Sequence, residues 1–256
     1  MILPGLVSVT FRNHSVEEII EMANEAGLQG IEWGGDIHVP QGNVKRALEV
    51  GNLTRQAGLK VAAYGSYYRV GCQSAGIELF ENILETAVSL GAPTIRVWAG
   101  NKDSENADSD WRALVVEESR TIADMAFKKG ITICFEYHSN TLTDTAASAM
   151  ELLQRCDHDN IRTLWQPSIS IDHVERQKSL EIVSPWLSNL HVYHWQDGEK
   201  YPLQSGEKEW LNYLKTASLI SGDRYALLEF VMDNSVKQFK DDARTLRKIL
   251  ASINSA

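Results

Sequence analysis

The feature of this 256-residue sequence that most constrains its fold is a regular alternation between two kinds of segment. Short apolar, β-branched runs, typical of buried strands, alternate with longer runs in which apolar residues recur with the period of a helix. The predicted strands are LVSVTF (6–11), GIEW (30–33), KVAAYG (60–65), TIRVWAG (94–100), ITICFEYH (131–138), IRTLWQP (161–167), NLHVYHW (189–195) and YALLEFV (225–231). The predicted helices lie near residues 15–27, 43–58, 76–91, 109–130, 144–156, 174–184, 207–220 and 235–251.

Strict alternation predicts parallel strands joined by helical crossovers, and eight repeats of about 30 residues match a (β/α)8 barrel. An open doubly wound sheet is the alternative. It would carry a ligand loop such as GxGxxG after a strand, and none of the predicted strands is followed by that pattern. No Pro-, Gly- or Ser-rich linker interrupts the series. We therefore expect one α/β domain, a single (β/α)8 barrel, over residues 1–256.

The charge balance indicates what kind of partner to expect. The chain has 34 acidic and 25 basic residues, a net charge of −9, and no block of Lys and Arg. This argues against nucleic acid or an anionic membrane as a partner and favours a small molecule. The first residues, MILPGLVSVTF, lack the features of a signal peptide, and no apolar run approaches the roughly 18 residues of a membrane span. We expect a cytoplasmic protein.

The segment ITICFEYH is an apolar run that ends on two polar groups. Side chains alternate across a strand, so Glu136 and His138 share one face, while Ile133 and Phe135 share the other. A buried carboxylate without a cation or hydrogen-bond donors costs several kcal/mol. Glu136 therefore needs a partner from elsewhere in the chain.

The same alternation places polar groups on the inward face of six predicted strands. They are Glu32 on the second, Arg96 and Trp98 on the fourth, Glu136 and His138 on the fifth, Gln166 on the sixth, His191 and Tyr193 on the seventh, and Glu229 on the eighth. In (β/α)8 barrels the reactive side chains lie at the C-terminal ends of the strands. These residues therefore predict a polar site at one mouth of the barrel.

Glu136, His191 and Glu229 provide a mixture of carboxylates and imidazole that suits Mg, Mn, Co or Zn, and Gln166 can add a carbonyl oxygen. The alternative is a set of buried ion pairs, for instance between Arg96 and one of the two glutamates. We favour a metal site, because two carboxylates converging inside one barrel need more positive charge than a single Arg conveniently supplies.

Several longer phrases resemble a known family. GIEWGGDIHVP, LGAPTIRVWAG, FEYHSNTLTDT and LLEFV resemble strands 2, 4, 5 and 8 of the xylose isomerase-like TIM barrels, which include sugar phosphate isomerases and epimerases, ketose 3-epimerases and relatives of endonuclease IV. The resemblance spans essentially the whole chain. It implies that Glu136, Gln166, His191 and Glu229 hold a divalent ion, Mn, Mg, Co or Zn.

The sixth strand departs from the family pattern. The family usually has Asp there, followed three residues later by His, whereas this chain has Gln166 and Ile169. Gln in place of Asp removes a negative charge from the ligand set, so we expect weaker metal binding and a more strongly Lewis-acidic ion. The absent His resembles a group that binds substrate hydroxyls in the epimerases.

The resemblance implies a metal-dependent isomerase or epimerase of a sugar or sugar derivative. In such chemistry a base removes a proton next to a carbonyl group, and positive charge stabilises the resulting enediolate. By resemblance, Glu136 and Glu229 are the acid/base pair as well as metal ligands. One alternative is a lyase or dehydratase acting on a keto-sugar or polyol through the same enediolate. Another is a catalytically inactive sugar-binding barrel, which Gln166 would favour; an endonuclease role is least favoured by the charge balance.

Residues at or just beyond the strand ends are expected to contact the substrate. Aromatic faces would line a sugar pocket, Arg96 would hold an anionic group, and imidazoles would bind hydroxyls. The predicted substrate-binding residues are Glu32, Trp33, His38, Tyr64, Arg96, Trp98, His138, His194 and Trp195. A barrel of this size also allows two copies to pair through their rim loops as a homo-oligomer.

Overall fold

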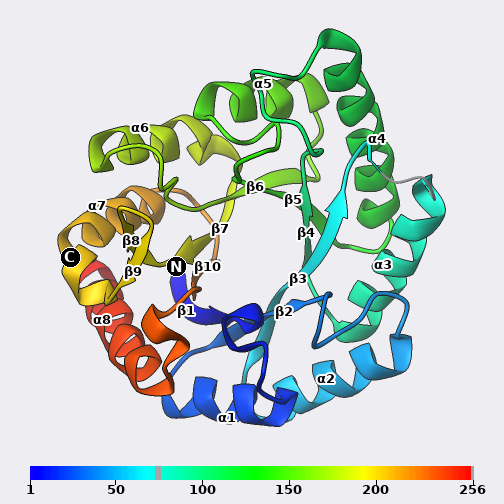
Figure 1. The fold of residues 1–256 in the computed structure, drawn as a ribbon. Helices are drawn as coiled ribbons and strands as arrows, with labels where there is room; N and C mark the ends of the chain where they lie inside the picture. The colour runs from blue at the N-terminus through cyan, green and yellow to red at the C-terminus, as the bar shows by residue number, and fades with distance from the viewer. Residues whose placement is uncertain (73–75, 255–256) are drawn as a thin grey trace.

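Eight parallel strands close into a barrel in a computed structural model that describes residues 1–72 and 76–254 (Figure 1). Around the barrel, each strand pairs with its neighbours in chain order, and the last strand, β10, closes on β1. The strands are β1 (Ile2–Val7), β2 (Gly30–Gly34), β3 (Lys60–Arg69), β4 (Thr94–Trp98), β5 (Thr132–Glu136), β6 (Ile161–Trp165), β7 (Leu187–Val192) and β10 (Arg224–Leu228). The predicted (β/α)8 barrel is confirmed.

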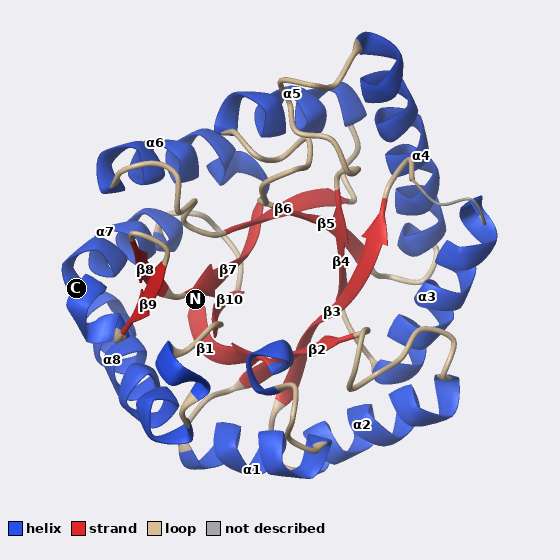
Figure 2. Ribbon diagram, viewed as in Figure 1, coloured by secondary structure: helices blue, strands red, loops and turns tan. Residues whose placement is uncertain are grey.

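The helices form a ring outside the barrel (Figure 2). They are α1 (Val16–Glu25), α2 (Val44–Gln56), α3 (Gly76–Leu90), α4 (Ser109–Phe127), α5 (Ala146–Cys156), α6 (His173–Val183), α7 (Glu207–Ser218) and α8 (Val236–Asn254). On α1, Ile19 and Ala23 are fully buried, and Ser15 forms a reciprocal capping box with Glu18. Among the described residues, no helix is both long and apolar enough to cross a lipid bilayer.

The first strand lies earlier in the chain than predicted. LVSVTF has the composition of a strand, but β1 ends at Val7, and Ser8–Phe11 form a short 3-10 helix. β1 instead includes Gly5, where a Cβ would lie only 2.7 Å from the carbonyl oxygen of Gly30 on β2. Glycine at this position therefore permits the close approach of β1 and β2.

The seventh predicted strand is divided into two elements. β7 ends at Val192, and β8 (His194–Gln196) pairs antiparallel with β9 (Glu199–Tyr201) beside α7 and α8 (Figure 1). The turn between them is Asp197-Gly198, and both residues have positive φ, 49° and 82°. Asp-Gly is favoured in tight hairpin turns for this reason.

Three predicted site residues lie just beyond the strands that were expected to contain them. Gln166 and Glu229 directly follow β6 and β10, and His138 lies two residues beyond β5. These polar residues therefore begin the loops that leave the mouth of the barrel.

Candidate active site

A pocket of about 490 Å³ opens at the C-terminal mouth of the barrel. Eight of the predicted site residues line it: Arg96, Trp98, Glu136, His138, Gln166, Tyr193, Trp195 and Glu229. His191 and Glu32 lie beneath them, 0% and 1% exposed. The mouth therefore gathers side chains from β2, β4, β5, β6, β7 and β10, or from the loops that follow them.

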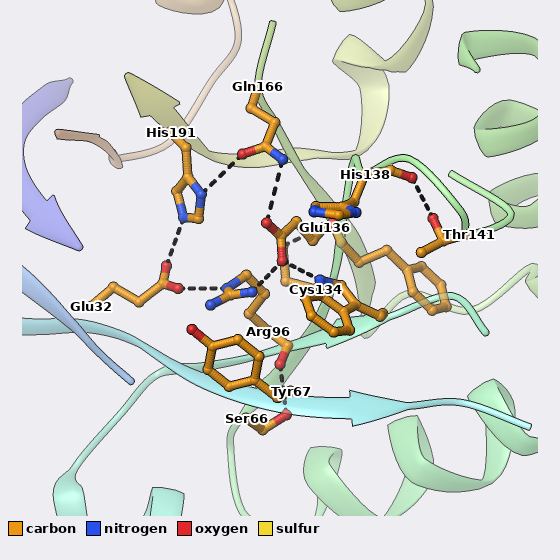
Figure 3. Close-up of polar contacts among 12 residues, drawn as sticks. Glu32, Ser66, Tyr67, Arg96, Cys134, Glu136, His138, Thr141, Gln166 and His191 are labelled. Atoms are coloured by element: carbon orange, nitrogen blue, oxygen red, sulfur yellow. Dashed lines mark hydrogen bonds and ion pairs between the residues drawn. The ribbon is translucent and has the colours of Figure 1, made fainter. Parts of the chain in front are cut away.

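At the centre is a buried arginine between two glutamates (Figure 3). Nε of Arg96 donates to Oε1 of Glu32 at 2.6 Å, and Nη1 donates to Oε2 of Glu136. All three side chains are 4% exposed or less. The ion pair considered from sequence as the alternative to a metal is therefore present for Glu136, and Arg96 has Glu32 as a second partner.

Gly65 on β3 makes room for this arrangement. A Cβ at Gly65 would lie 2.5 Å from Nη2 of Arg96 and 3.0 Å from Oε1 of Glu32. Any side chain here would displace the ion pair. The Gly in KVAAYG is thus a sequence signal for the buried pair that the strand pattern did not reveal.

The charges of this centre stabilise one another. Burial raises the pKa of the Glu32 carboxyl, but Arg96 and then His191 outweigh burial and lower that pKa to about 2. Burial also raises the pKa of Glu136, and Arg96 again reverses the effect, so the net shift is downward. Burial lowers the pKa of Arg96, but the two glutamates raise it well above its usual value. All three groups are charged at neutral pH.

His191 on β7 lies between Glu32 on one side and Glu229 and Gln166 on the other. Its Nε2 lies 3.2 Å from Oε2 of Glu32, while its Nδ1 lies 3.2 Å from Oε2 of Glu229 and 3.3 Å from Oε1 of Gln166. Burial lowers the pKa of the imidazole, but Glu229 and Glu32 together raise it to about 10. The ring therefore carries protons on both nitrogens and counters two carboxylates.

Glu229 has a buried oxygen without a hydrogen bond. Its Oε2 accepts none from the described residues, although Nδ1 of His191 lies 3.2 Å away. Such an atom is costly unless a cation or donor satisfies it. Within residues 1–72 and 76–254, however, no three His, Cys, Asp or Glu side chains are arranged by themselves to hold a metal ion.

With the carbonyl oxygen of Gln166 included, Gln166, His191 and Glu229 fit a divalent ion in the type and spacing of their ligand atoms, and Glu136 adds a carboxylate beside them. Atoms bound to one ion at 2.0–2.2 Å lie roughly 3 Å apart. Nδ1 of His191 lies 3.3 Å from Oε1 of Gln166 and 3.2 Å from Oε2 of Glu229, whereas Oε1 of Glu136 accepts from Nε2 of the Gln166 amide at 3.3 Å. Three carboxylates and one guanidinium also leave two negative charges in excess once His191 is neutral, which a divalent ion would balance.

His138 lines the pocket beside Trp98. Its Nδ1 lies 2.7 Å from the carbonyl oxygen of Ser139 and so carries a hydrogen that it donates, which leaves Nε2 of the neutral ring free to accept a proton. The Trp98 ring lies 5.3 Å from the His138 ring between centroids, and its Nε1 donates to Oε2 of Glu136. Arg69 also stacks on Trp98, with its guanidinium carbon 3.9 Å from the centroid of the Trp98 ring.

Two aromatic residues predicted to contact the substrate do not line the pocket. Because Glu32 points into the barrel, its neighbour Trp33 points outward, where Nε1 donates to Oγ1 of Thr54 on α2 at 3.1 Å. Tyr64 is fully buried and donates its hydroxyl to the carbonyl oxygen of Val39 at 2.9 Å. Trp33 therefore joins β2 to α2, and Tyr64 joins β3 to the loop after β2.

Two histidines predicted to contact the substrate also lie outside the pocket. Nδ1 of His38 is 3.0 Å from Oγ of Ser8, which fastens the loop after β2 to the 3-10 helix after β1. His194 packs against Gly206, where a Cβ would lie 2.4 Å from Nδ1 of His194. The candidate site therefore contains neither residue.

Tyr67 is a pocket residue that the predicted strand ends missed. The register of β3 against β4 shifts between Gly65 and Tyr68, and Tyr67 has a φ of 58°. Its ring centroid lies 5.1 Å from the guanidinium carbon of Arg96, and its hydroxyl accepts from Nη2 of Arg12 at 3.2 Å. The sequence signal was the stretch GSYYRVG, where strand residues continue past the predicted end.

Residues 20–249 match the profile of the xylose isomerase-like TIM barrel family, and the chain belongs to that family. The family resemblance of the sequence is thereby confirmed. A similar curated protein is the 3-dehydroshikimate dehydratase of Bacillus anthracis, which is 27% identical over 203 residues, covering 73% of this chain and 70% of that protein.

Solved structures share the fold. A probable 3-DHS dehydratase from Bacillus anthracis superimposes with a TM-score of 0.81 at 22% identity, over 96% of this chain and 99% of that one. A family member from Mycobacterium smegmatis in complex with magnesium gives 0.77 at 15% identity, covering 99% and 98%. A D-psicose 3-epimerase with D-tagatose from Clostridium cellulolyticum H10 gives 0.72 at 15%, covering 99% of both chains.

Proposed function

We propose that this protein is a metal-assisted dehydratase of a small cyclic hydroxy-keto acid, with 3-dehydroshikimate as the first substrate to test. The observation that carries the proposal is the pairing, in one pocket, of a free imidazole nitrogen on His138 with the carboxylates of Glu136 and Glu229. The likeness to a 3-dehydroshikimate dehydratase supports it. The dehydratase considered from sequence as an alternative thus becomes the leading function.

His138 is better suited than Glu136 to move the proton. Oε2 of Glu136 accepts from Arg96 and Trp98, and its Oε1 faces Nε2 of Gln166 at 3.3 Å. A carboxylate with three donors is a weak base. Nε2 of His138 has no such partner among the described residues, and histidine is the side chain that most often acts as a general base.

The loss of water would proceed in two balanced steps, after which the dienone that forms loses a ring proton and gains one on its oxygen to become aromatic. Nε2 of His138 takes the proton from the carbon next to the ketone, and the electron pair of that C–H bond moves onto the carbonyl oxygen to form an enediolate. The electrons then return, the bond to a β-hydroxyl breaks, and the imidazolium gives its proton to that hydroxyl, which leaves as water. No oxidant or reductant is needed.

Glu136, Gln166, His191 and Glu229 would hold the divalent ion, Mn, Mg, Co or Zn, which when bound supplies positive charge to stabilise the charge developing on the substrate oxygens. Glu32 accepts from Nε2 of His191 and so keeps Nδ1 directed at Gln166 and Glu229. Trp98 would pack against one face of the substrate and limit the access of water.

An isomerase or epimerase of a sugar derivative is the second candidate. Epimerisation needs acid/base groups on both faces of the substrate, and the buried Oε2 of Glu229, which accepts no hydrogen bond from the described residues, favours it. The sequence-based prediction that Glu136 and Glu229 form this acid/base pair belongs to this alternative. Ile169, at the position of the family's usual His, lines the same pocket and offers no hydrogen bond to a hydroxyl.

The test is to incubate protein carrying Mn²⁺ with 3-dehydroshikimate and to follow the ultraviolet absorbance of an aromatic product. We expect turnover that chelator abolishes and that His138→Asn lowers by about 10²–10⁴-fold. His158→Asn, at the opposite end of the barrel, is the control and should retain activity. Exchange of solvent deuterium into ketoses without dehydration would favour the epimerase, and absence of both reactions would refute the enzymatic proposal.

A further inference from the structure

A second hollow adjoins the mouth pocket and has a different character. Its volume is about 360 Å³, and it is formed by residues 9–14 together with Lys200, Phe230 and Asn234. It shares Val9, Arg12 and Phe230 with the mouth pocket. The two spaces are therefore neighbours.

Lys200 supplies positive charge to this hollow. It lies on β9 and is half-buried, with its Nζ 5.5 Å from the ring centroid of Phe230 and 5.8 Å from that of Trp195. Its described polar contact is a hydrogen bond to Oδ1 of Asn234 at 3.2 Å, and no ion pair is formed with any described carboxylate. Because an ammonium has three donors, Lys200 retains donors for a further ligand.

The remaining walls add donors and no negative charge. None of the described residues that line the hollow is Asp or Glu, although the whole chain carries a net charge of −9. Thr10 also lines it, is only 6% exposed, and has a hydroxyl without a hydrogen-bond partner in the described part of the chain. A buried hydroxyl in this state is expected to be satisfied by something the protein binds.

Arg12 lines both spaces and is held in place by its partners. It forms an ion pair with Asp36 and donates from Nη2 to the hydroxyl of Tyr67 at 3.2 Å. Its charge is thereby largely compensated by Asp36. The uncompensated charge of the hollow is that of Lys200, which an anionic group would neutralise.

We propose that this hollow is an anion subsite that binds a carboxylate through Lys200 and Thr10. The carboxylate is that of the substrate, whose reacting carbons occupy the mouth pocket. This identification of the anion deepens the proposed function and rests on it. A separate small anion beside the substrate would have the same chemistry. Ammonium and hydroxyl donors around one carboxylate form charge-assisted hydrogen bonds of the stronger kind.

The test compares an acid with its ester. Binding of shikimate and of shikimate methyl ester is measured by calorimetry in wild type, Lys200→Met, Thr10→Val and Lys208→Met, the last an exposed lysine on α7 that serves as control. Wild type and Lys208→Met should bind the acid about tenfold more tightly than the ester, and Lys200→Met should lose this preference. Thr10→Val should lose part of it.

Inorganic phosphate distinguishes the source of the anion. If it stabilises wild type against heat but not Lys200→Met, and does not compete with shikimate, the subsite serves a separate anion. The subsite is refuted if Lys200→Met equals Lys208→Met with all three probes. If Lys200→Met turns over 3-dehydroshikimate with an unchanged KM, the subsite does not bind the substrate carboxylate, and the proposed function stands. If Lys200→Met loses the preference for the acid but wild type does not turn over 3-dehydroshikimate, the subsite stands and the proposed function is rejected.

Discussion

Nε2 of His191 lies 3.2 Å from Oε2 of Glu32, on the opposite side of the imidazole from Glu229. Glu32 also accepts from Arg96, so one buried carboxylate orients both the imidazole and the guanidinium of the site. Carboxylates behind a ligating His commonly fix its tautomer and its direction. The position of Glu32 beneath the pocket suits this role better than the substrate contact predicted from sequence.

The first prediction concerns Glu32→Gln. The amide still fits, but it loses the charge that attracts Arg96 and the proton on Nε2 of His191. We expect Mn²⁺ affinity to fall by about 10–100-fold. Calorimetric titration of chelator-treated protein measures this without a substrate. Glu117→Gln, an exposed change on α4, should bind as wild type does, and equal affinities for the two variants would contradict the assignment.

The second prediction concerns pH. The pKa of His191 is raised from 6.5 to about 10 in the folded, metal-free protein. Its contribution to stability is therefore complete below pH 6.5 and is lost as the pH rises toward 10, by roughly 5 kcal/mol. Urea unfolding of chelator-treated protein between pH 6 and 10 should show this decline. His191→Gln should remove that part of the slope, and parallel curves for both proteins would count against it.

The third prediction concerns Gln166→Glu, which adds a charge where the family usually has Asp. The new carboxylate would face Oε1 of Glu136, now 3.3 Å from the Gln166 amide, so the metal-free protein should melt about 4 °C lower. Saturating Mn²⁺ should reverse the order, because the ligand set gains a negative charge. Gln154→Glu, exposed on α5, should show neither effect. A variant that binds Mn²⁺ no better than wild type would argue against Gln166 as a ligand.

The fourth prediction concerns Arg96→Met. Removing the guanidinium leaves Glu32 and Glu136 buried without their main cation, which should cost about 3–5 kcal/mol of unfolding free energy. Denaturant unfolding measures the loss. Adding Glu32→Gln to Arg96→Met should recover part of it, because one uncompensated charge is removed. Strictly additive effects of the two changes would mean that the pair does not interact as the distances indicate.

Much of the candidate site followed from strand periodicity. In a parallel barrel the C-terminal ends of all strands meet at one mouth, so inward parity alone brought together Glu136, Gln166 and Glu229. The same rule places Trp33 outside, because it adjoins the inward Glu32. Its aromatic character suggested a pocket residue, but alternation decides the face.

Tyr67 and the hairpin were harder to predict. The register shift in β3 turns Tyr67 toward Arg96 with a positive φ, and the strand pattern does not encode a local irregularity of this kind. The hairpin of β8 and β9 had a signal in Asp197-Gly198, but the apolar run before it read as one continuous strand.

The amino-acid sequence by itself determined the architecture and the family, because eight repeats of an amphipathic pattern have few ways to bury their apolar faces. Only the tertiary structure decided which charges are partners. Arg96 is 64 positions from Glu32 and 40 from Glu136, and its choice of partners depends on the space left by Gly65 and on the curvature of the closed sheet. Electrostatic pairing acts over a few ångströms in space, and separation along the chain carries no record of it.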